Sequence, residues 1–512
     1  MITTVRRLLA GVLAGVAAAG APATAGAQSP LPAPAPPAPP VLTWGPCGRA
    51  AAAPFECATA AVPLDYDQPA GATVPLALVR RPADAPAERL GTLFVNPGGP
   101  GASGVDAAVG LTPALPDDLR RRFDIVGFDP RGVARSAAVA CWPRREYDAA
   151  FAATQVVTGV PSLAASLRTA RGLVEGCRLR SGALLPYIGT EYVARDMDLL
   201  RAAVGDERLT YLGLSYGTYL GTVYANLFPE RVRALVLDGA YDPTAYRDRP
   251  YDYDRGQYVA LERSLSHFLR WCSGHPRRCR FGDGRAFKAF DALVAELDAN
   301  PQRVAGGTVN AATVLVQVAL MLDAGRDVWP QLGAALALAA GTGGQRPFGP
   351  TSNQLATLFA ANTAVECADR AFPRSRAVLR QQLRVEAGLG RRMGRLFAYG
   401  PPSYDQGHAT ACTQWPRAAA ESAPSRYPGG FAAPGAPPVV VVGTTGDPDT
   451  PYPDAVALAQ TLASAKLVTF RGEGHTAFLR SACVTVQVTD YLVDLAVPGK
   501  EVCDDEAPVP GG

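Results

Sequence analysis

The segment Gly213-Leu214-Ser215-Tyr216-Gly217 contains the serine of this sequence best placed to act as a nucleophile. It lies between an apolar run at 209–212 and a helix-like stretch at 218–227. At a sharp turn from a strand into a helix, the residues two before and two after the serine crowd each other, so both are glycine. The strained turn lifts the serine hydroxyl out of the top of the sheet. The pattern therefore predicts a nucleophile elbow at Ser215.

A serine hydroxyl is a weak nucleophile at neutral pH and needs a base, which in turn needs an orienting group. The chain has four histidines. His267 and His275 lie in a helical region, and His408 lies in a loop rich in glycine and proline. His475, in Gly-Glu-Gly-His-Thr, alone follows a strand-like segment. We expect His475 to be the base.

The orienting carboxylate should follow a strand end and precede the histidine along the chain. Asp447, in Gly-Asp-Pro-Asp-Thr-Pro, satisfies both conditions after the apolar run at 439–442. It would hold the imidazole tautomer and stabilise the imidazolium. Asp449 is expected instead to cap a helix that Pro451 helps to start. The alternatives to Asp447 are Asp238, which ends the strand after the elbow, Asp449 and Asp454.

An oxyanion hole requires two backbone N–H groups aimed at the developing negative oxygen. One is expected from Tyr216, which follows the nucleophile, and the other from the loop at 96–101, Asn-Pro-Gly-Gly-Pro-Gly. Gly99 is the preferred donor and Gly98 the second choice. The loop spacing matches neither a dinucleotide-binding fingerprint nor a phosphate loop with its lysine. The charged segment at 129–136 is interpreted as a tight turn with a carboxylate–arginine bridge under the site.

Strand and helix patterns alternate through the first and last parts of the chain, which favours a parallel sheet with helices on both faces. The fold class is predicted to be α/β, an α/β-hydrolase fold with a mostly parallel central sheet. Helical periodicity dominates the middle of the chain, which is expected to be an inserted, mainly helical cap. The predicted parts are a first core segment at 42–243, the cap at 244–427, a second core segment at 428–505 and a tail at 506–512.

Composition indicates an ordinary globular protein with a near-neutral surface. Of 512 residues, 48% are hydrophobic and 19% charged, with a formal net charge of +3 and no basic stripe that would suggest nucleic acid. Residues 1–27 have a basic start, a short apolar run and an Ala-Gly-Ala site typical of a cleaved signal peptide. Residues 28–41 form a linker rich in proline and alanine. We expect a secreted or cell-envelope protein with no membrane span in the mature chain.

Ten cysteines in an exported chain indicate disulfides rather than a metal cluster, since no Cys-x-x-Cys pair with histidine partners is present. Pairing neighbours along the sequence keeps each bridge within one region of the chain. The predicted bridges are Cys47–Cys57, Cys141–Cys177, Cys272–Cys279, Cys367–Cys412 and Cys483–Cys503.

Taken together, these motifs resemble the secreted tripeptidyl aminopeptidases of actinobacteria and their relatives among mycobacterial cell-envelope serine hydrolases. The resemblance spans about residues 42–503 and is most specific from 439 onwards. It implies Ser215, Asp447 and His475 as the triad, and release of short peptides, often tripeptides, from free N-termini. Pro97 stands where prolyl aminopeptidases carry histidine, which argues against a strict proline preference. The matching segments are 96–101, 129–136, 213–217, 367–369, 446–451 and 474–475.

An exopeptidase of this kind has to anchor a free α-ammonium at a fixed distance from the nucleophile, and a carboxylate does so best. Asp369 and Glu366, beside Cys367 in the predicted cap, are the candidate anchors. Both also fit a purely structural role.

We therefore expect a monomeric serine aminopeptidase that acts on peptides with free N-termini and needs no metal or organic cofactor. The same triad serves esterases and lipases, so an ester hydrolase is the first alternative. An exported, non-catalytic binding protein on the same fold is the second.

Overall fold

The computed structural model describes residues 37–504 except 49, 158–161, 305–306, 342–347, 350–351 and 405. The predicted signal peptide, most of the predicted linker and all of the predicted tail lie outside the described residues. Within these residues the central feature is a ten-stranded sheet in the order β1-β2-β3-β5-β4-β6-β7-β10-β11-β12. Its first strands pair antiparallel, as far as β3 with β5, and every later pairing is parallel.

The parallel strands are short apolar runs, as expected for strands that are buried on both faces. β4 and β5 are buried along their whole length, and β10 along nearly all of it. The apolar runs at 209–212 and 439–442 lie within the strands Leu209–Leu214 and Val439–Gly446, as the sequence pattern predicts. The strands of the sheet are β1 (Gly45–Pro46), β2 (Glu56–Pro63), β3 (Thr73–Arg81), β4 (Gly91–Asn96), β5 (Phe123–Phe128), β6 (Leu209–Leu214), β7 (Val232–Asp238), β10 (Val439–Gly446), β11 (Ala465–Glu473) and β12 (Val502–Cys503).

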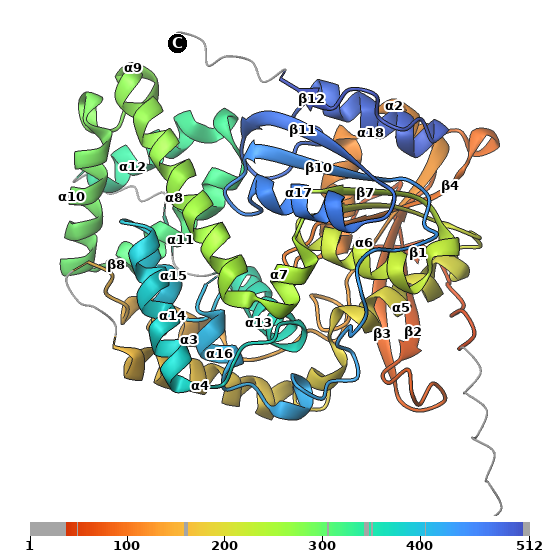
Figure 1. Cartoon of the computed structure of the whole chain (residues 1–512), viewed down its shortest axis with the longest axis horizontal. Coiled ribbons are helices and arrows are strands. Elements are labelled where there is room, and N and C mark those ends of the chain that lie inside the picture. Colours follow the sequence, from red (N-terminus) through yellow and green to blue (C-terminus); the bar gives the residue numbers. More distant parts are fainter. Residues whose placement is uncertain are drawn as a thin grey trace, which may run out of the picture. The chain divides into compact units, whose positions relative to one another are not determined.

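Helices cover both faces of the sheet (Figure 1). One apolar cluster joins one face to α1 (Gly104–Leu111), α2 (Asp117–Arg122) and α18 (Ala482–Asp494). A larger cluster joins the other face to α5 (Thr190–Ala203), α6 (Tyr216–Leu227) and α17 (Tyr452–Thr461). The predicted fold class is confirmed, because the alternation of strand and helix builds a three-layer α/β structure.

Between β7 and β10 the chain runs through a helical segment that lies beside the sheet (Figure 1). Its only strands among the described residues form the small hairpin β8 (Gln302–Val304) and β9 (Gly307–Val309). Its helices are α7 (Pro243–Asp248), α8 (Pro250–Gly274), α9 (Pro276–Cys279), α10 (Ala286–Ala299), α11 (Ala311–Asp323), α12 (Trp329–Ala340), α13 (Asn353–Asp369), α14 (Arg376–Leu389), α15 (Gly394–Tyr399) and α16 (His408–Cys412).

Two helices that precede the nucleophile also pack against this helical segment. α3 (Arg144–Ala152) and α4 (Leu163–Ser181) fall within the predicted first core segment. The Ser166 hydroxyl donates to the carbonyl of Tyr399 on α15, and the Asn310 amide donates to the carbonyl of Phe151 on α3. The helical layer beside the sheet is therefore built from two separate stretches of the chain.

All five predicted disulfides are confirmed. Each bridge joins cysteines that are neighbours in sequence, and the separations range from 7 to 45 residues. Cys367–Cys412 ties α13 to α16 within the helical segment, and Cys483–Cys503 ties α18 to β12.

The sequence predicts Thr190 as the N-cap of a helix at 192–203 and Asp449 as the cap of the helix that Pro451 helps to start, and both predictions are wrong. Thr190 is the first residue of α5 and Gly189 occupies the N-cap position, because the Thr190 hydroxyl is held by Asp369 and Tyr216 instead. Asp449 does not cap α17, whose N-cap is Pro451 with no side-chain cap bond. In both cases a tertiary contact competes with the local capping role and replaces it.

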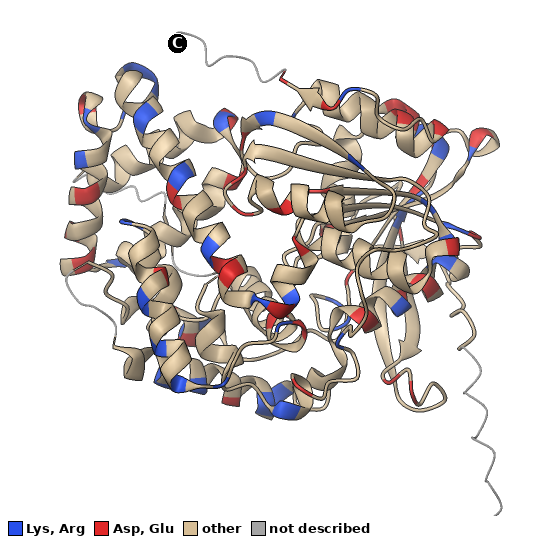
Figure 2. Cartoon of the chain, viewed as in Figure 1, with Lys and Arg blue, Asp and Glu red and all other residues tan. Residues whose placement is uncertain are grey.

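Basic and acidic residues are interspersed over the ribbon (Figure 2), in keeping with the small net charge. Across the described part of the chain, no helix combines the length and apolar character needed to cross a bilayer.

Candidate active site

Ser215 sits on a strained turn between β6 and α6. Its φ is +57° and its ψ is −129°, which is unfavourable for a residue with a side chain. A Cβ on Gly213 would lie 2.4 Å from the Gly217 carbonyl oxygen, and one on Gly217 would lie 2.9 Å from Asn96 Oδ1. Both flanking glycines are therefore required by close contacts, as the sequence pattern predicts.

The glycine loop after β4 packs directly against this turn. A Cβ on Gly98 would lie 2.8 Å from the backbone nitrogen of Tyr216 and 2.8 Å from Ser215 Cβ. The Gly98 N–H donates to Asn96 Oδ1 at 2.9 Å and is not available to a ligand. The Gly99 N–H has no partner among the described residues. Of the two predicted donors in this loop, Gly99 is therefore the one whose N–H is not already used within the described residues.

The same loop is held from the other side by the helical segment. Asn362 on α13 donates its amide to the carbonyl of Pro100 at 3.2 Å, and its Oδ1 lies 2.8 Å from His408 Nε2. Both side chains are buried. Burial lowers the pKa of His408 to about 4, so this histidine is neutral and acts as a structural donor. The glycine loop thus depends on residues more than 260 positions away.

Asp447 and His475 are brought together by the ends of β10 and β11. His475 Nδ1 lies 3.0 Å from Asp447 Oδ2 and 3.1 Å from Oδ1. Asp447 is fully buried and also accepts from the backbone N–H groups of Asp449, Thr450 and Thr476. The Thr450 hydroxyl lies between the two, 2.9 Å from Asp447 Oδ2 and 3.1 Å from His475 Nδ1. These contacts fix the orientation of the imidazole.

The two atoms that catalysis would pair, Ser215 Oγ and His475 Nε2, are buried and have no hydrogen-bond partner within the described ranges. Catalytic hydrogen bonds are often long in the absence of substrate and tighten in the complex.

Asp238, weighed as an alternative acid, serves a different contact. Its carboxylate accepts from the backbone N–H groups of Ala477 and Phe478 at 2.7–3.1 Å. Burial raises its pKa to about 6. Asp238 therefore holds the loop that carries His475, and Asp447 is the carboxylate on the imidazole. Asp454, the third alternative, is a residue of the α17 first turn.

The electrostatic environment of His475 is unusually acidic. Burial by itself lowers a histidine pKa, but the carboxylates of Asp447, Asp449 and Asp323 outweigh it and raise the pKa of His475 to about 10. Asp449 Oδ2 lies 3.7 Å from Nε2, on the side of the ring that a serine would use. The carbonyl of Asp323 accepts from the His475 backbone N–H at 2.7 Å.

The charged turn at 129–136 is structural. Arg131 is fully buried and forms a bidentate pair with Asp196 at 2.6 and 2.7 Å. Asp129 accepts from the hydroxyl of Ser103 and the backbone of Arg135, whose guanidinium lies 3.4 Å away. The predicted carboxylate–arginine bridge joins Asp129 and Arg135. The fully buried Arg131 pairs instead with Asp196 on α5.

Glu366 and Asp369, predicted as amine anchors, hold partners inside the protein. Glu366 pairs with Arg370 at 2.6 Å and accepts from the Tyr246 hydroxyl at 3.1 Å. Asp369 accepts from the backbone and hydroxyl of Thr190, and burial raises its pKa to about 7. These contacts pack α13 against the core, so a carboxylate that is open to a ligand has to be sought elsewhere.

Sequence reasoning missed Thr450, Asn362 and Asp323. Thr450 follows Asp447 by three residues, and a hydroxyl at this spacing can donate to the carboxylate. This contact could have been predicted from the local sequence. Asn362 and Asp323 lie on helices of the inserted segment, where no local pattern marks a polar residue as part of a site.

An elbow serine followed along the chain by an aspartate and then a histidine, at the carboxyl ends of parallel strands, is the order of one class of enzymes. The fold and site define this class: the protein is a serine hydrolase.

A comparison with protein-family models agrees: the model described as the alpha/beta hydrolase fold matches residues 91–482. The chain belongs to this family.

It is also similar over most of its length to curated proteins of actinobacteria. It is 34% identical over 470 residues to the serine protease Hip1 of Mycobacterium tuberculosis, with 86% of each chain covered. It is 33% identical over 468 residues to the tripeptidyl aminopeptidase of Streptomyces coelicolor, with 88% of this chain and 83% of the other covered. It is 36% identical over 488 residues to carboxylesterase B of Mycobacterium tuberculosis, with 90% and 89% covered.

Proposed function

We propose that this protein is a secreted serine exopeptidase that releases short peptides, most often tripeptides, from free N-termini. Ser215 is the nucleophile, His475 the general base and acid, and Asp447 the group that orients the imidazole. The observation that carries the proposal is the contact of 3.0 Å between His475 Nδ1 and Asp447, which leaves Nε2 facing away from the carboxylate. The similarity to a serine protease and to a tripeptidyl aminopeptidase supports a peptide substrate.

The reaction follows from these positions. Ser215 Oγ attacks the scissile carbonyl carbon while His475 Nε2 takes its proton. The carbonyl oxygen becomes an oxyanion and accepts from the N–H groups of Tyr216 and Gly99. When the tetrahedral intermediate collapses, the C–N bond breaks and His475 returns the proton to the leaving amine. Water then attacks the acyl-enzyme with His475 as base and frees the peptide acid and Ser215.

Export is supported by the disulfides. Five bridges are present within the described ranges, and such bonds persist in oxidising compartments. The basic and apolar pattern of residues 1–27 is the expected export signal.

The test is a parallel assay of a tripeptide anilide with a free N-terminus and of a short acyl ester. We expect hydrolysis of both, and release of intact tripeptides from longer peptides by mass spectrometry. Ser215→Ala should abolish both activities together with labelling by a fluorophosphonate. Activity on esters with none on any peptide would reject the peptidase proposal, and labelling that survives Ser215→Ala would reject Ser215 as nucleophile.

The second candidate is a carboxylesterase. The observation that favours it is the 36% identity to carboxylesterase B, and the triad serves both reactions. The same two assays separate the candidates.

A further inference from the structure

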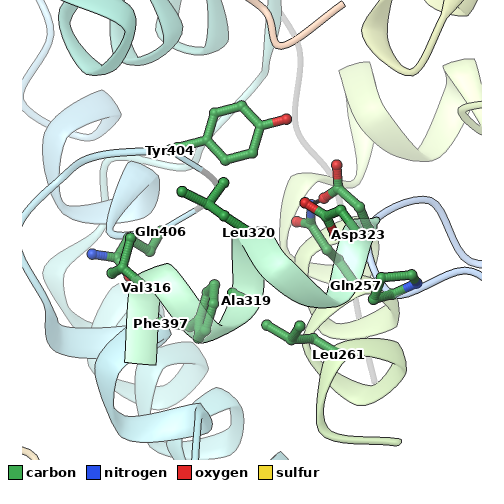
Figure 3. Close-up of a pocket in the computed structure, with 11 residues that line it drawn as sticks. Gln257, Leu261, Val316, Ala319, Leu320, Asp323, Phe397, Tyr404 and Gln406 are labelled. Atoms are coloured by element: carbon green, nitrogen blue, oxygen red, sulfur yellow. Dashed lines mark hydrogen bonds between the residues drawn. The ribbon is translucent and has the colours of Figure 1, made fainter. Parts of the chain in front are cut away.

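A pocket beside His475 joins an acidic end to an apolar end. It lies between α8, α11, α15 and the loop after β10. Figure 3 shows Asp323 and Gln257 on one side of it and Val316, Phe397 and Gln406 on the other. Asp449 also lines the pocket. The apolar wall is made by Leu261, Val316, Ala319, Leu320 and Phe397.

The acidic end is fixed in position close to the reacting atoms. Gln257 donates its amide to Asp449 Oδ1 at 2.5 Å, and Asp449 Oδ2 lies 3.7 Å from His475 Nε2. The main chain of Asp323 is held by its bond from the His475 backbone. Burial raises the pKa of Asp323 well above its ordinary value, and the neighbouring Asp449 charge raises it further. A cation between the carboxylates of Asp323 and Asp449 would offset both the cost of burying the Asp323 charge and its repulsion by Asp449.

The pocket also offers an unused acceptor. Gln406 is fully buried, and its Oε1 has no hydrogen-bond partner within the described part of the chain. The amide nitrogen of the same side chain is used by the carbonyl of Pro401 at 3.3 Å. A buried acceptor without a partner is costly, and a donor on a ligand in the pocket would satisfy it. Two carboxylates and one amide oxygen around apolar walls suit a ligand that brings N–H donors and an apolar body.

We propose that this pocket binds the N-terminal residue of the peptide substrate, with its α-ammonium between Asp323 and Asp449 and its side chain against the apolar wall. This inference rests on the proposed exopeptidase function and adds the anchor that such an enzyme requires. Gln406 accepts from a peptide N–H of the same ligand.

The position of the anchor also limits the length of the released peptide. The ammonium would lie about 2.8 Å from a carboxylate oxygen, and that of Asp449 is 3.7 Å from His475 Nε2. With about 3 Å from Nε2 to the serine and about 3 Å from the serine to the scissile carbon, the ammonium lies at most about 12 Å from that carbon. Since an extended residue spans about 3.3–3.6 Å, a released peptide bound in extended conformation has at most about three residues between the anchor and the scissile carbon.

The experiment compares kcat/KM for tripeptide anilides with a free and with an N-acetylated N-terminus. The variant is Asp323→Asn, and the matched control is Asp327→Asn, which removes an exposed carboxylate four residues further along. We expect the wild type and the control to prefer the free amine. Asp323→Asn should lower that preference by about 10- to 100-fold, mainly through KM, because a hydrogen bond to a charged group is lost. Hydrolysis of the N-acetylated substrate should change only through the pKa of His475, which the Asp323 charge helps to raise, so the ratio between the two substrates at one pH is the readout.

An unchanged preference in Asp323→Asn, with normal fluorophosphonate labelling, overturns the inference. A second outcome would also show that the inference is wrong. If Asp323→Asn instead reduces a preference for peptides with an internal lysine over peptides with norleucine at the same position, the pocket binds a cationic side chain and not the α-ammonium. Should Asp323→Asn fold poorly, binding of free and N-acetylated tripeptides to Ser215→Ala provides the same comparison by calorimetry. Equal affinities would again overturn it. If the wild-type protein cleaves esters but no peptide, the proposed exopeptidase function is wrong. This result differs from failure of the anchor, in which free and N-acetylated peptides are both cleaved without preference.

Discussion

Replacing Asp449 by asparagine should make His475 a weaker base. The side chain keeps its shape and its acceptor for Gln257, but the charge 3.7 Å from Nε2 disappears. Two unit charges at this distance interact by about 1 kcal/mol in water and by about 4 kcal/mol at the effective dielectric constant typical of proteins. One pKa unit corresponds to about 1.4 kcal/mol. The pKa of His475 should therefore fall by about one to three units in Asp449→Asn.

The assay is the pH dependence of kcat/KM for an N-acetylated, uncharged substrate, which leaves the acidic pocket without an ammonium. The base works only when His475 is neutral, and the pKa of His475 in the free protein is raised to about 10. Activity of the wild type should thus rise with pH into the alkaline range. In Asp449→Asn the midpoint should move down by one to three units, while Asp327→Asn should leave it in place. A midpoint that stays put or moves upward would refute the reasoning.

The same shift predicts how stability depends on pH. The folded pKa of His475, about 10, exceeds the unfolded value of about 6.5. The protonated form therefore stabilises the fold fully below pH 6.5, and this contribution is lost as pH rises towards 10. The free energy of unfolding, measured in urea, should contain a decrease over this window that is smaller in Asp449→Asn. Equal decreases in both proteins would contradict the assigned contacts.

Three further predictions concern positioning and stability. Asn362→Ala removes the bond to the glycine loop and should lower kcat about tenfold with little change in KM in the ester assay; an unchanged kcat would exclude this positioning role. Asp196→Ala leaves Arg131 buried without its carboxylate and should cost about 3–5 kcal/mol of unfolding free energy in urea; a loss below 1 kcal/mol would argue against the buried pair. Replacing Cys367 and Cys412 by serine opens a bridge between residues 45 positions apart, and loop entropy predicts a loss of about 4 kcal/mol, measured in the same way. Unaltered stability would mean that the bridge constrains little.

Much of the site could be predicted from the sequence because its signals are local. The elbow glycines are needed within five residues of each other, and the structure shows the close contacts that demand them. The strand before each functional loop is a short apolar run, which indicates a buried parallel strand without any tertiary information. The neighbour pairing of the cysteines is local in the same sense, with separations of 45 residues or fewer.

Other predictions failed or were missing because a distant partner decided the contact. Thr190 has the residue type of an N-cap, but Asp369 lies 179 residues away in sequence and takes its hydroxyl. Asp449 has the spacing of a helix cap, but Gln257 on α8 and the imidazole of His475 define its position.

The sequence by itself determined the sheet, the elbow, the order of serine, aspartate and histidine, and the disulfides, because short-range geometry dictates each of them. Only the tertiary structure decided what surrounds that machinery. The inserted helices bring Asn362 to the glycine loop and Asp323 to His475, and these contacts depend on how helices pack rather than on any pattern along the chain. The acidic pocket, and with it the proposed choice of substrate, follows from that packing.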